Sequence, residues 1–383
     1  MSKKAEELIR KFIEGYEYKK DFAYRDLSPR EITSALDQHV IGQEHAKKVL
    51  AVAVRNHIKR IADPSGRIQK SNILLLGPSG SGKTLLAKSL AKILDVPLAI
   101  ADATSLTEAG YVGDDVESIL TRLLDAADGN VCKAERGIVF IDEIDKISRK
   151  ARSRSITRDV SGEGVQHALL KIIEGAEVSV PLGGGRKHPG GGNVMIHTEN
   201  ILFICGGAFE GLGSQHHTPR VQIGFGMPVR QCNSGMQETT KGSDPVCCEE
   251  NSLRHAVTAE DLIRYGMTPE LMGRLPIIVE LHALGKADLV RILTEPVHSL
   301  IGEYQALLET DGVALEFTDE ALDEIASIAI QRQIGARGLR SILEELMLDV
   351  MYSAPEHVGE KCLITRDTVQ HKGITYTRKQ QIA

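Results

Sequence analysis

The sequence of 383 residues contains no tryptophan, and aromatic residues make up only 4% of it. Binding of single-stranded nucleic acid relies on aromatic rings that stack on bases, and this chain has few of them. Its 46 Lys and Arg residues are outnumbered by 52 Asp and Glu residues, which gives a net charge of -6. Phosphate binding needs an excess of cations, so we expect no nucleic-acid partner, although a local basic channel is compatible with this charge.

The chain also lacks any run of about 18 apolar residues, so we expect no membrane span and no membrane partner. The first ten residues are polar and charged rather than apolar, which is unlike a secretory leader. Six cysteines are present without any C-x-x-C pair. Together these features predict a protein of the reducing cytoplasm.

A metal site built on cysteine remains an alternative for one region. Cys232, Cys247 and Cys248 lie near the pair His216 and His217. Regular ligand spacing is missing, so we interpret these cysteines as free thiols in a flexible loop. Residues 211–256 as a whole are rich in Gly, Ser, His, Gln and Thr without periodicity, which is typical of a loop.

Apolar runs in the first two thirds of the chain alternate with helical patterns. We predict strands at 72–76, 98–100, 137–141 and 200–204, and helices at 83–94, 116–127 and 163–174. Continuous apolar runs are typical of strands that are buried on both faces of a parallel sheet. The order of elements therefore predicts an α/β fold with a doubly wound parallel sheet.

Changes in composition suggest the domain organisation. Residues 1–27 form an N-terminal extension or linker, and Ser28 begins a helix with proline in its first turn. We expect a large domain over 28–281 and a hinge at 282–286. Helices at 321–330 and 339–352, with short strands at 314–317 and 362–364, predict a smaller, mainly helical α+β domain over 287–383.

A phosphate-binding loop follows the first predicted strand and precedes a helix. It has the pattern G-x-x-x-x-G-K-[ST] and consists of Gly77, Pro78, Ser79, Gly80, Ser81, Gly82, Lys83 and Thr84. The glycines allow successive backbone N–H groups to surround the phosphates of ATP, and the helix N-terminus adds its positive dipole end. Lys83 would neutralise phosphate charge and the Thr84 hydroxyl would bind Mg²⁺. A chance glycine turn is the alternative.

Two acids, Asp142 and Glu143, follow the apolar strand at 137–141. Ligands of open α/β sheets bind at the carboxyl ends of the strands, which is where Asp142 would lie and hold Mg²⁺. Glu143 would polarise the water that attacks ATP. These acids could instead cap the next helix, a role that Asp145 could also fill. The combined motifs predict an ATPase that uses ATP and Mg²⁺.

Several further segments resemble the ClpX family, the hexameric AAA+ unfoldases that feed the ClpP peptidase. The similarity covers about 28–355, apart from 227–256, and includes the runs 95–104, 110–113 and 161–166. It implies an AAA+ fold, a homo-hexameric ring, unfolded or tagged protein substrates, a ClpP-type peptidase ring as partner, and no peptidase site in this chain.

The resemblance also assigns residues that would face the substrate. Tyr111 and Val112, between two glycines, match the pore loop of the family; without the resemblance, this segment reads as a turn with Tyr111 in the core. Arg154–Ser161 corresponds to the second pore loop. Arg186, Lys187 and His188 match a cationic loop at the pore mouth, where acidic chain ends would be attracted. A solvated basic turn is the alternative for that tripeptide.

Other matches concern the peptidase and the shared nucleotide site. Ile223, Gly224 and Phe225 resemble the loop that docks on the peptidase, although residues 227–256 depart from the charged stretch expected there. Arg274 matches the arginine finger that reaches a neighbour's ATP, and Arg337 matches the second sensor, which touches ATP in its own chain. For both arginines a surface ion pair is the alternative. Val40 and Ile41 match the adenine pocket, although the same residues could simply begin a helix.

The sequence differs from the family pattern in one respect, and two other classes of AAA+ protein are alternatives. Family members commonly begin with a zinc-binding domain of four cysteines, and this chain has no cysteine before Cys132. An HslU-type unfoldase would carry a long insertion between Thr84 and Asp142, for which the sequence leaves no room. A DNA-acting AAA+ motor would carry a basic DNA-binding module, which we do not find in the C-terminal part.

Overall fold

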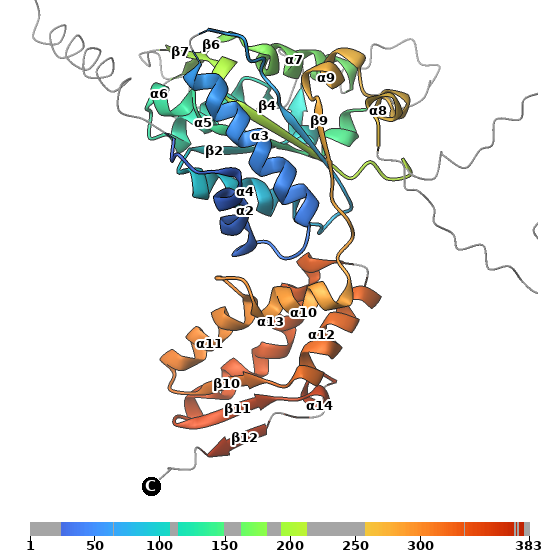
Figure 1. Ribbon diagram of the computed structural model, residues 1–383. Coiled ribbons are helices and arrows are strands. Elements are labelled where there is room, and N and C mark those ends of the chain that lie inside the picture. Colours follow the sequence, from blue (N-terminus) through green and yellow to red (C-terminus); the bar gives the residue numbers. More distant parts are fainter. Residues whose placement is uncertain are drawn as a thin grey trace, which may run out of the picture.

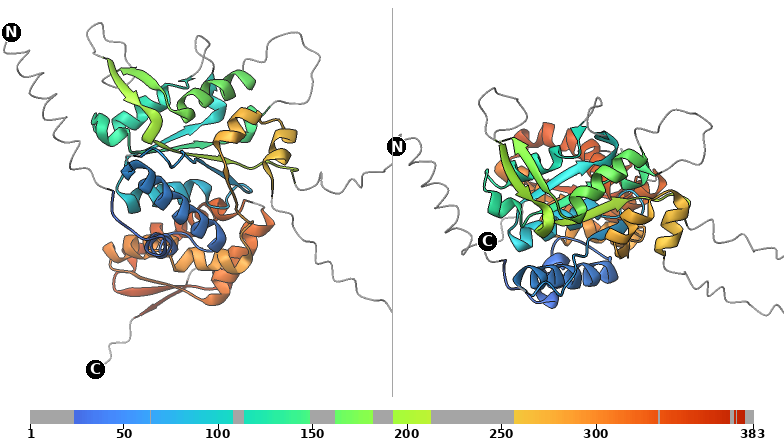
Figure 2. Two further views of the ribbon diagram at one scale, coloured as in Figure 1. Left: turned by 45° about the horizontal axis from the view of Figure 1, so that its top comes forward. Right: turned by 90° about the horizontal axis from the view of Figure 1, so that it is seen from above.

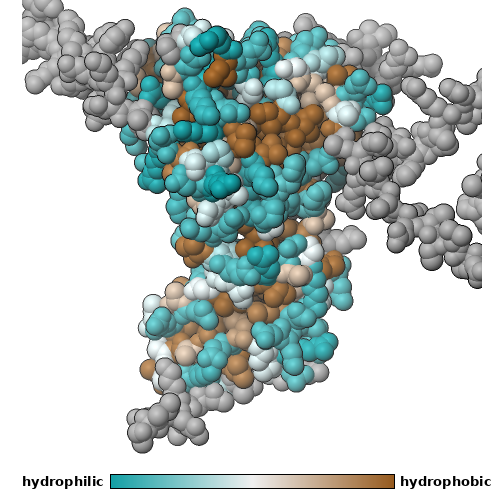
Figure 3. Space-filling view, in the orientation of Figure 1, coloured by the Kyte–Doolittle hydropathy of each residue, from teal (hydrophilic) through white to brown (hydrophobic). Residues whose placement is uncertain are grey.

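The computed structural model describes residues 24–63, 65–107, 114–148, 162–181, 193–212, 257–332, 334–370, 373 and 375–378. The described residues form a larger upper part and a smaller lower part, which the chain joins through the segment after β9 (Ile277–Glu280; Figure 1). A narrow waist separates the two parts in the space-filling view (Figure 3).

A five-stranded sheet lies at the centre of the larger part. All its neighbouring strands pair in parallel, in the order β2-β5-β8-β1-β9. The strands are β1 (Ile73–Leu76), β2 (Leu98–Asp102), β5 (Ile138–Asp142), β8 (Leu202–Gly207) and β9 (Ile277–Glu280). The predicted fold class, a doubly wound parallel sheet, is confirmed.

Side chains from alternate positions of these strands enter two different cores. Leu74, Val139 and Phe203 pack with the helices of one face. Ile73, Ile138 and Phe140 pack with those of the other face. The sheet is thus buried on both sides, which explains why its strands are continuous apolar runs rather than alternating ones.

Helices cover both faces of the sheet (Figures 1 and 2). Those packed on one face are α2 (Pro29–Asp37), α3 (Glu44–Ala62) and α4 (Lys83–Leu94). The other face and its surroundings hold α5 (Ser118–Ala126), α6 (Val131–Ala134), α7 (Glu163–Glu174), α8 (Ala259–Tyr265) and α9 (Pro269–Arg274). Short elements complete this part: the 3-10 turns η2 (Ala103–Ser105), η3 (Ile144–Ile147) and η4 (Thr198–Asn200), the pair β3 (Leu106–Thr107) and β4 (Asp114–Asp115), and the antiparallel pair β6 (Glu177–Pro181) and β7 (Asn193–His197).

The smaller part has its own apolar core, formed mainly by helices. Its helices are α10 (Lys286–Thr294), α11 (Leu300–Thr310), α12 (Asp319–Gln331), α13 (Ala336–Ser353) and α14 (Arg366–Val369), with the 3-10 turn η6 (Ala354–Glu356). A three-stranded sheet is formed by β10 (Ala314–Phe317), β11 (Glu360–Ile364) and β12 (Thr375–Arg378). The predicted mixed and mainly helical character of this part is confirmed.

Local predictions hold where the sequence carries a local signal. Ser28 accepts a hydrogen bond from the backbone of Glu31, whose carboxylate accepts one from the Ser28 N–H, which completes a capping box. The predicted limits of α4, α7 and β10 agree with the structure. Val52 of α3 is 44% exposed, although its side chain is apolar. No helix in the described ranges is both long and apolar enough to cross a lipid bilayer.

Candidate functional site

The phosphate-binding loop joins the carboxyl end of β1 to the first turn of α4, as the sequence predicts. Its first residue is tied to the neighbouring strand, since the Gly77 N–H donates a 3.2 Å hydrogen bond to the carbonyl of Gly207. A β-carbon on Gly77 would lie 2.7 Å from the carbonyl oxygen of Leu281. Only glycine fits between the loop and the chain that leaves β9.

Lys83 turns its side chain back into this loop. Its Nζ donates to the carbonyls of Gly77 at 2.6 Å and Pro78 at 3.0 Å, and the residue is only 9% exposed. Burial lowers the pKa of Lys83, and the nearby carboxylate of Asp142 opposes that shift. An ammonium group held among carbonyls at a helix N-terminus suits a phosphate anion.

Ser81 carries a second polar group directed into the same loop. The residue is 2% exposed, and its hydroxyl has no hydrogen-bond partner among the described residues. Buried polar groups are nearly always hydrogen-bonded in folded proteins. The unsatisfied hydroxyl, the buried ammonium and the glycine backbone together fit a bound phosphate chain.

The two predicted magnesium ligands lie in contact. Oγ1 of Thr84, in the first turn of α4, donates a 2.9 Å hydrogen bond to Oδ2 of Asp142, the last residue of β5. A hydroxyl and a carboxylate are hard oxygen donors, which is the chemistry that Mg²⁺ selects. These residues therefore fit the metal that the sequence predicts for them.

Glu143 lies directly beyond Asp142 with an exposed side chain and a left-handed backbone, at φ 55°. Its N–H donates to Oδ1 of Asp142 at 3.0 Å. The neighbouring acid Asp145 is buried and accepts a 3.1 Å hydrogen bond from the N–H of Ala208. Asp145 thus has a structural contact, whereas Glu143 extends from the strand end into solvent beside the loop.

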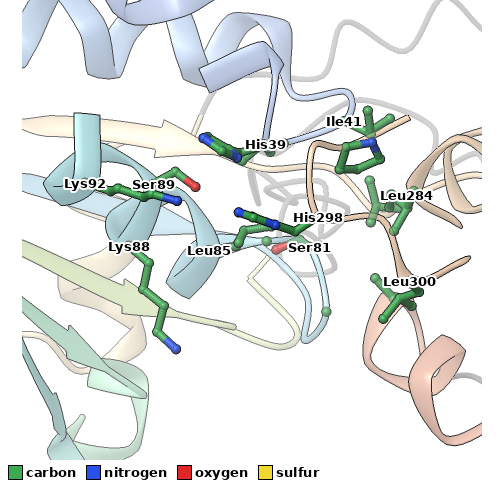
Figure 4. A pocket seen from close by; sticks show the side chains of 16 residues that line it. His39, Ile41, Ser81, Leu85, Lys88, Ser89, Lys92, Leu284, His298 and Leu300 are labelled. Atoms are coloured by element: carbon green, nitrogen blue, oxygen red, sulfur yellow. The ribbon is translucent and has the colours of Figure 1, made fainter. Parts of the chain in front are cut away.

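A cavity of about 300 Å³ adjoins the loop between the two parts of the chain. The predicted adenine-pocket residues Val40 and Ile41 line it, together with Gly80, Ser81 and Gly82 of the loop. Side chains of α4 and of the smaller part complete the lining: Leu85, Lys88, Ser89, Lys92, Leu284, Ile292, Pro296, His298, Leu300 and Ala336, with His39 beside Val40. Figure 4 shows His39 and His298 facing one another across this space.

The sequence predicted Arg337 from the smaller part, but not the residues of that part that line the cavity. The rings of His39 and His298 are nearly parallel, at 14°, with centroids 6.2 Å apart. Beside them, the Val297 N–H donates a 3.1 Å hydrogen bond to the carbonyl of Gln38. No motif marks these residues, because they become neighbours only when the two parts of the chain meet.

The side chain of Gln43 makes contacts near the site that were likewise not predicted from the sequence. Its Nε2 donates to the carbonyl of His282 at 2.8 Å and approaches that of Ser81 at 3.4 Å, while its Oε1 accepts from the N–H of His282 at 3.1 Å. One amide therefore joins the phosphate-binding loop to the predicted hinge at 282–286.

The smaller part also reaches the phosphate-binding loop directly. A β-carbon on Gly80 would lie 3.4 Å from the backbone of Ile334 and Ala336, and one on Gly335 would lie 3.5 Å from the carbonyl of Ser79. The predicted sensor Arg337 follows in the first turn of α13 and is itself exposed. Burial is the main cause of the lowered pKa of Lys83, and the positive charge of Arg337 lowers that pKa further.

Arg274 lies at the other end of the sheet. It ends α9, just before β9, and Ile277 at the start of β9 pairs with Ile73 at the start of β1. The phosphate-binding loop leaves the opposite end of β1, and a strand of four residues spans about 13 Å. Arg274 is thus separated from the loop of its own chain, while Arg337 lies beside it.

The remaining predicted site residues lie outside the described residues. These are Tyr111 and Val112 of the predicted pore loop, the segment Arg154–Ser161, the cationic residues Arg186, Lys187 and His188, and the docking residues Ile223, Gly224 and Phe225. The cysteines and histidines considered for a metal site at 216–248 lie outside them as well.

Comparisons with known proteins agree with this architecture. Residues 68–278 match the family AAA domain (Cdc48 subfamily), and residues 284–358 match the C-terminal, D2-small domain, of ClpB protein. The ATP-dependent Clp protease ATP-binding subunit ClpX of Treponema denticola is 54% identical over 345 residues, which cover 88% of this chain and 80% of that protein.

The chain belongs to the ClpX family. Membership of the ClpX family, together with the AAA domain, makes the chain an AAA+ ATPase that binds nucleotide, and not a peptidase. The resemblance stated from the sequence is therefore confirmed at the level of family, fold and enzyme class. ClpX-family membership also supports the expected activity, ATP-dependent protein unfolding.

Proposed function

We propose that this chain is an ATP-dependent protein unfoldase and translocase that delivers its substrates to a ClpP-type peptidase ring. The observation that carries the proposal is the cavity at the phosphate-binding loop, which both parts of the chain line. A nucleotide held there would contact both Ile41 and Leu284. Its binding and release would therefore change the orientation of the two parts relative to one another. Such a movement is what a translocating motor requires.

In this proposal the domains follow the limits expected from the sequence, 28–281 for the large domain and 287–383 for the small one. Lys83 and the loop glycines hold the phosphates, and Val40 and Ile41 contact the base. Thr84 and Asp142 hold Mg²⁺, which neutralises the charge that develops on the phosphates during hydrolysis. Glu143 orients the attacking water, and its exposed position at the strand end supports that role.

We further propose that the active assembly is a ring, a homo-hexamer, in which Arg274 completes the site of a neighbouring subunit. Two observations support a role in trans: Arg274 lies at the opposite end of β1 from its own loop, and its side chain is about half exposed. Arg337, beside the loop, would act on the nucleotide of its own chain. A guanidinium near the γ-phosphate stabilises charge in the transition state.

The substrate-facing roles are also proposals. Tyr111 and Val112 would grip a polypeptide in the central pore, Arg186, Lys187 and His188 would attract unfolded or tagged chains, and Ile223, Gly224 and Phe225 would dock on the peptidase. We propose a cytoplasmic location, with neither nucleic acid nor membrane as partner. The pore, entry and docking roles rest on the family resemblance of those segments, whereas the location and the excluded partners rest on composition and charge.

The proposal is tested by degradation of a stably folded, tagged protein in the presence of ATP and a ClpP-type peptidase. Wild-type protein should support degradation. Glu143→Gln should abolish it while still binding ATP, since loss of a general base typically lowers the rate by about 10² to 10⁴. Degradation that survives this substitution would refute the role of Glu143, and no degradation by the wild type would refute the proposed function.

A stimulation assay separates this function from that of a DNA-acting AAA+ motor. An unfolded tagged protein should raise the ATPase rate, whereas duplex DNA should not. The reverse pattern would favour the DNA-acting class.

A further inference from the structure

We infer that Glu174 is a positioning residue for Arg274: the carboxylate holds one edge of the guanidinium so that the other edge stays directed at a neighbouring subunit. The inference rests on the trans role proposed for Arg274 and adds the residue that prepares this arginine. It starts from an ion pair between the last residues of two helices, α7 and α9.

The contact uses a defined side of the arginine. Nε of Arg274 lies 3.0 Å from Oε1 of Glu174, and one terminal nitrogen, Nη2, lies 2.9 Å from the same oxygen. The other terminal nitrogen, Nη1, makes no hydrogen bond within the described part of the chain. A guanidinium has five N–H donors in a planar fork, so holding one edge leaves donors on the other edge for a phosphate.

The backbone of Arg274 is fixed separately. Nδ2 of Asn72 donates a 3.0 Å hydrogen bond to the Arg274 carbonyl, and Oδ1 of Asn72 accepts from the N–H of Phe203. Asn72 is 1% exposed. The main chain at Arg274 is therefore anchored to β8 through a buried amide, and Glu174 supplies the remaining constraint on the long side chain.

The placement of Glu174 is unfavourable for its own helix. A carboxylate at the C-terminal end of α7 faces the negative end of the helix dipole, where cations are preferred. Gly175, at φ 118°, ends the helix directly after it, with the backbone of Glu199 close by. Helix stability does not explain an acid at this position, whereas contact with Arg274 does.

There is also space for a partner beside this pair. Glu174 and Arg274 line a polar cavity of about 820 Å³, along with Arg60, Lys70 and Glu199. Both members of the pair are partly exposed, at 41% and 55% of their side-chain surface. A group from another subunit can therefore approach the outer edge of the guanidinium without displacing buried structure.

The test is steady-state ATP hydrolysis by the full chain at saturating protein concentration. Glu174→Ala should lower kcat about tenfold, because a catalytic group that loses its orientation loses rate steeply. KM for ATP should stay within about twofold, because the phosphate-binding loop of the same chain is untouched. Glu174→Gln should recover most of the loss, because its amide oxygen still accepts from Nε of Arg274.

A matched control is Glu345→Ala, which breaks an exposed ion pair with Arg332 in the smaller part. It should leave kcat unchanged. Thermal melting should be similar for wild type, Glu174→Ala and Glu345→Ala, since exposed ion pairs contribute little to stability. A loss of kcat in Glu345→Ala equal to that in Glu174→Ala would overturn the inference.

A double substitution separates the inference from the function on which it rests. Glu174→Ala combined with Arg274→Ala should be no slower than Arg274→Ala alone, because Glu174 acts only through Arg274. An additive loss, or an unchanged kcat in Glu174→Ala, would refute the positioning role. A normal kcat in Arg274→Ala would instead refute the trans role of Arg274 itself.

Discussion

The Thr84 hydroxyl donates a 2.9 Å hydrogen bond to the carboxylate of Asp142, which links the first turn of α4 to the end of β5. The two residues are 58 positions apart in the sequence and belong to different motifs. Their contact means that the two proposed magnesium ligands are already in place relative to one another. Metal binding would then need only small changes in these side chains.

Thr84→Ala should raise the Mg²⁺ concentration needed for half-maximal ATPase activity by at least about tenfold, because it removes one oxygen from the site. A magnesium titration of the ATPase rate measures this shift. Thr84→Ser, which keeps the hydroxyl, is the control and should remain near wild type. Equal magnesium dependence in all three proteins would show that Thr84 is not a ligand.

Gly77→Ala should destabilise the protein more than Gly82→Ala. Both glycines have positive φ, at 156° and 98°. An added β-carbon on Gly77 would meet Leu281, whereas one on Gly82 would meet no atom within 4 Å. We expect the extra overpacking at Gly77 to cost about 1–3 kcal/mol. Urea denaturation of the two variants measures the difference, and equal midpoints would contradict the expectation.

Gln43→Ala should weaken the connection between the phosphate-binding loop and the hinge. The substitution removes the two hydrogen bonds between the Gln43 amide and the backbone of His282, each worth about 1 kcal/mol. We expect a lower melting temperature and a higher KM for ATP. Gln38→Ala is a suitable control, because Gln38 uses its backbone carbonyl in its contact with Val297. A similar KM in both variants would argue against the role given to the Gln43 side chain.

His57 should make the protein sensitive to acid. Burial lowers its pKa from 6.5 to about 3, while Nε2 contacts the carbonyl of Asn200 at 3.1 Å. Between these two values the unfolded chain binds a proton that the folded chain does not, so stability falls as pH drops from about 6.5 towards 3. His57→Gln, whose amide can donate to the same carbonyl, should lose less stability over this window.

Melting temperatures at pH 7, 6, 5 and about 4 would measure that difference between wild type and His57→Gln. Carboxylates titrate in both proteins and largely cancel in the comparison. Parallel curves for the two proteins would mean that His57 does not contribute to the acid response.

The core of the fold was predictable because its signals are local. The apolar run before Gly77, the acids at the end of β5 and the Ser28 cap each indicate their structure within a few residues. Strand β9 was not predicted. Its four residues follow a proline directly, and they form a strand because β1 offers an open edge beside them. That edge exists only in the folded sheet.

The nucleotide site was predicted mainly from motifs of the larger part, with Arg337 as the one residue predicted from the smaller part. The loop and Asp142 carry known patterns, and they lie together as expected. His298 and Leu300 line the same cavity from elements more than 200 residues later, with no motif to mark them. The partner of Arg274 was likewise hidden, since nothing near Glu174 in the sequence indicates a contact 100 positions away.

The position of Arg274 at the far end of β1 determines how many nucleotide sites of an assembly can be complete. Suppose that Arg274 of each subunit completes the nucleotide site of one neighbouring subunit. In a linear assembly, the subunit at one end then has no neighbour to supply Arg274, and its nucleotide site stays incomplete. Only closure of the assembly into a ring gives every nucleotide site an Arg274. Activity per chain should then rise with protein concentration and level off once rings are closed, so that the rate itself reports on assembly.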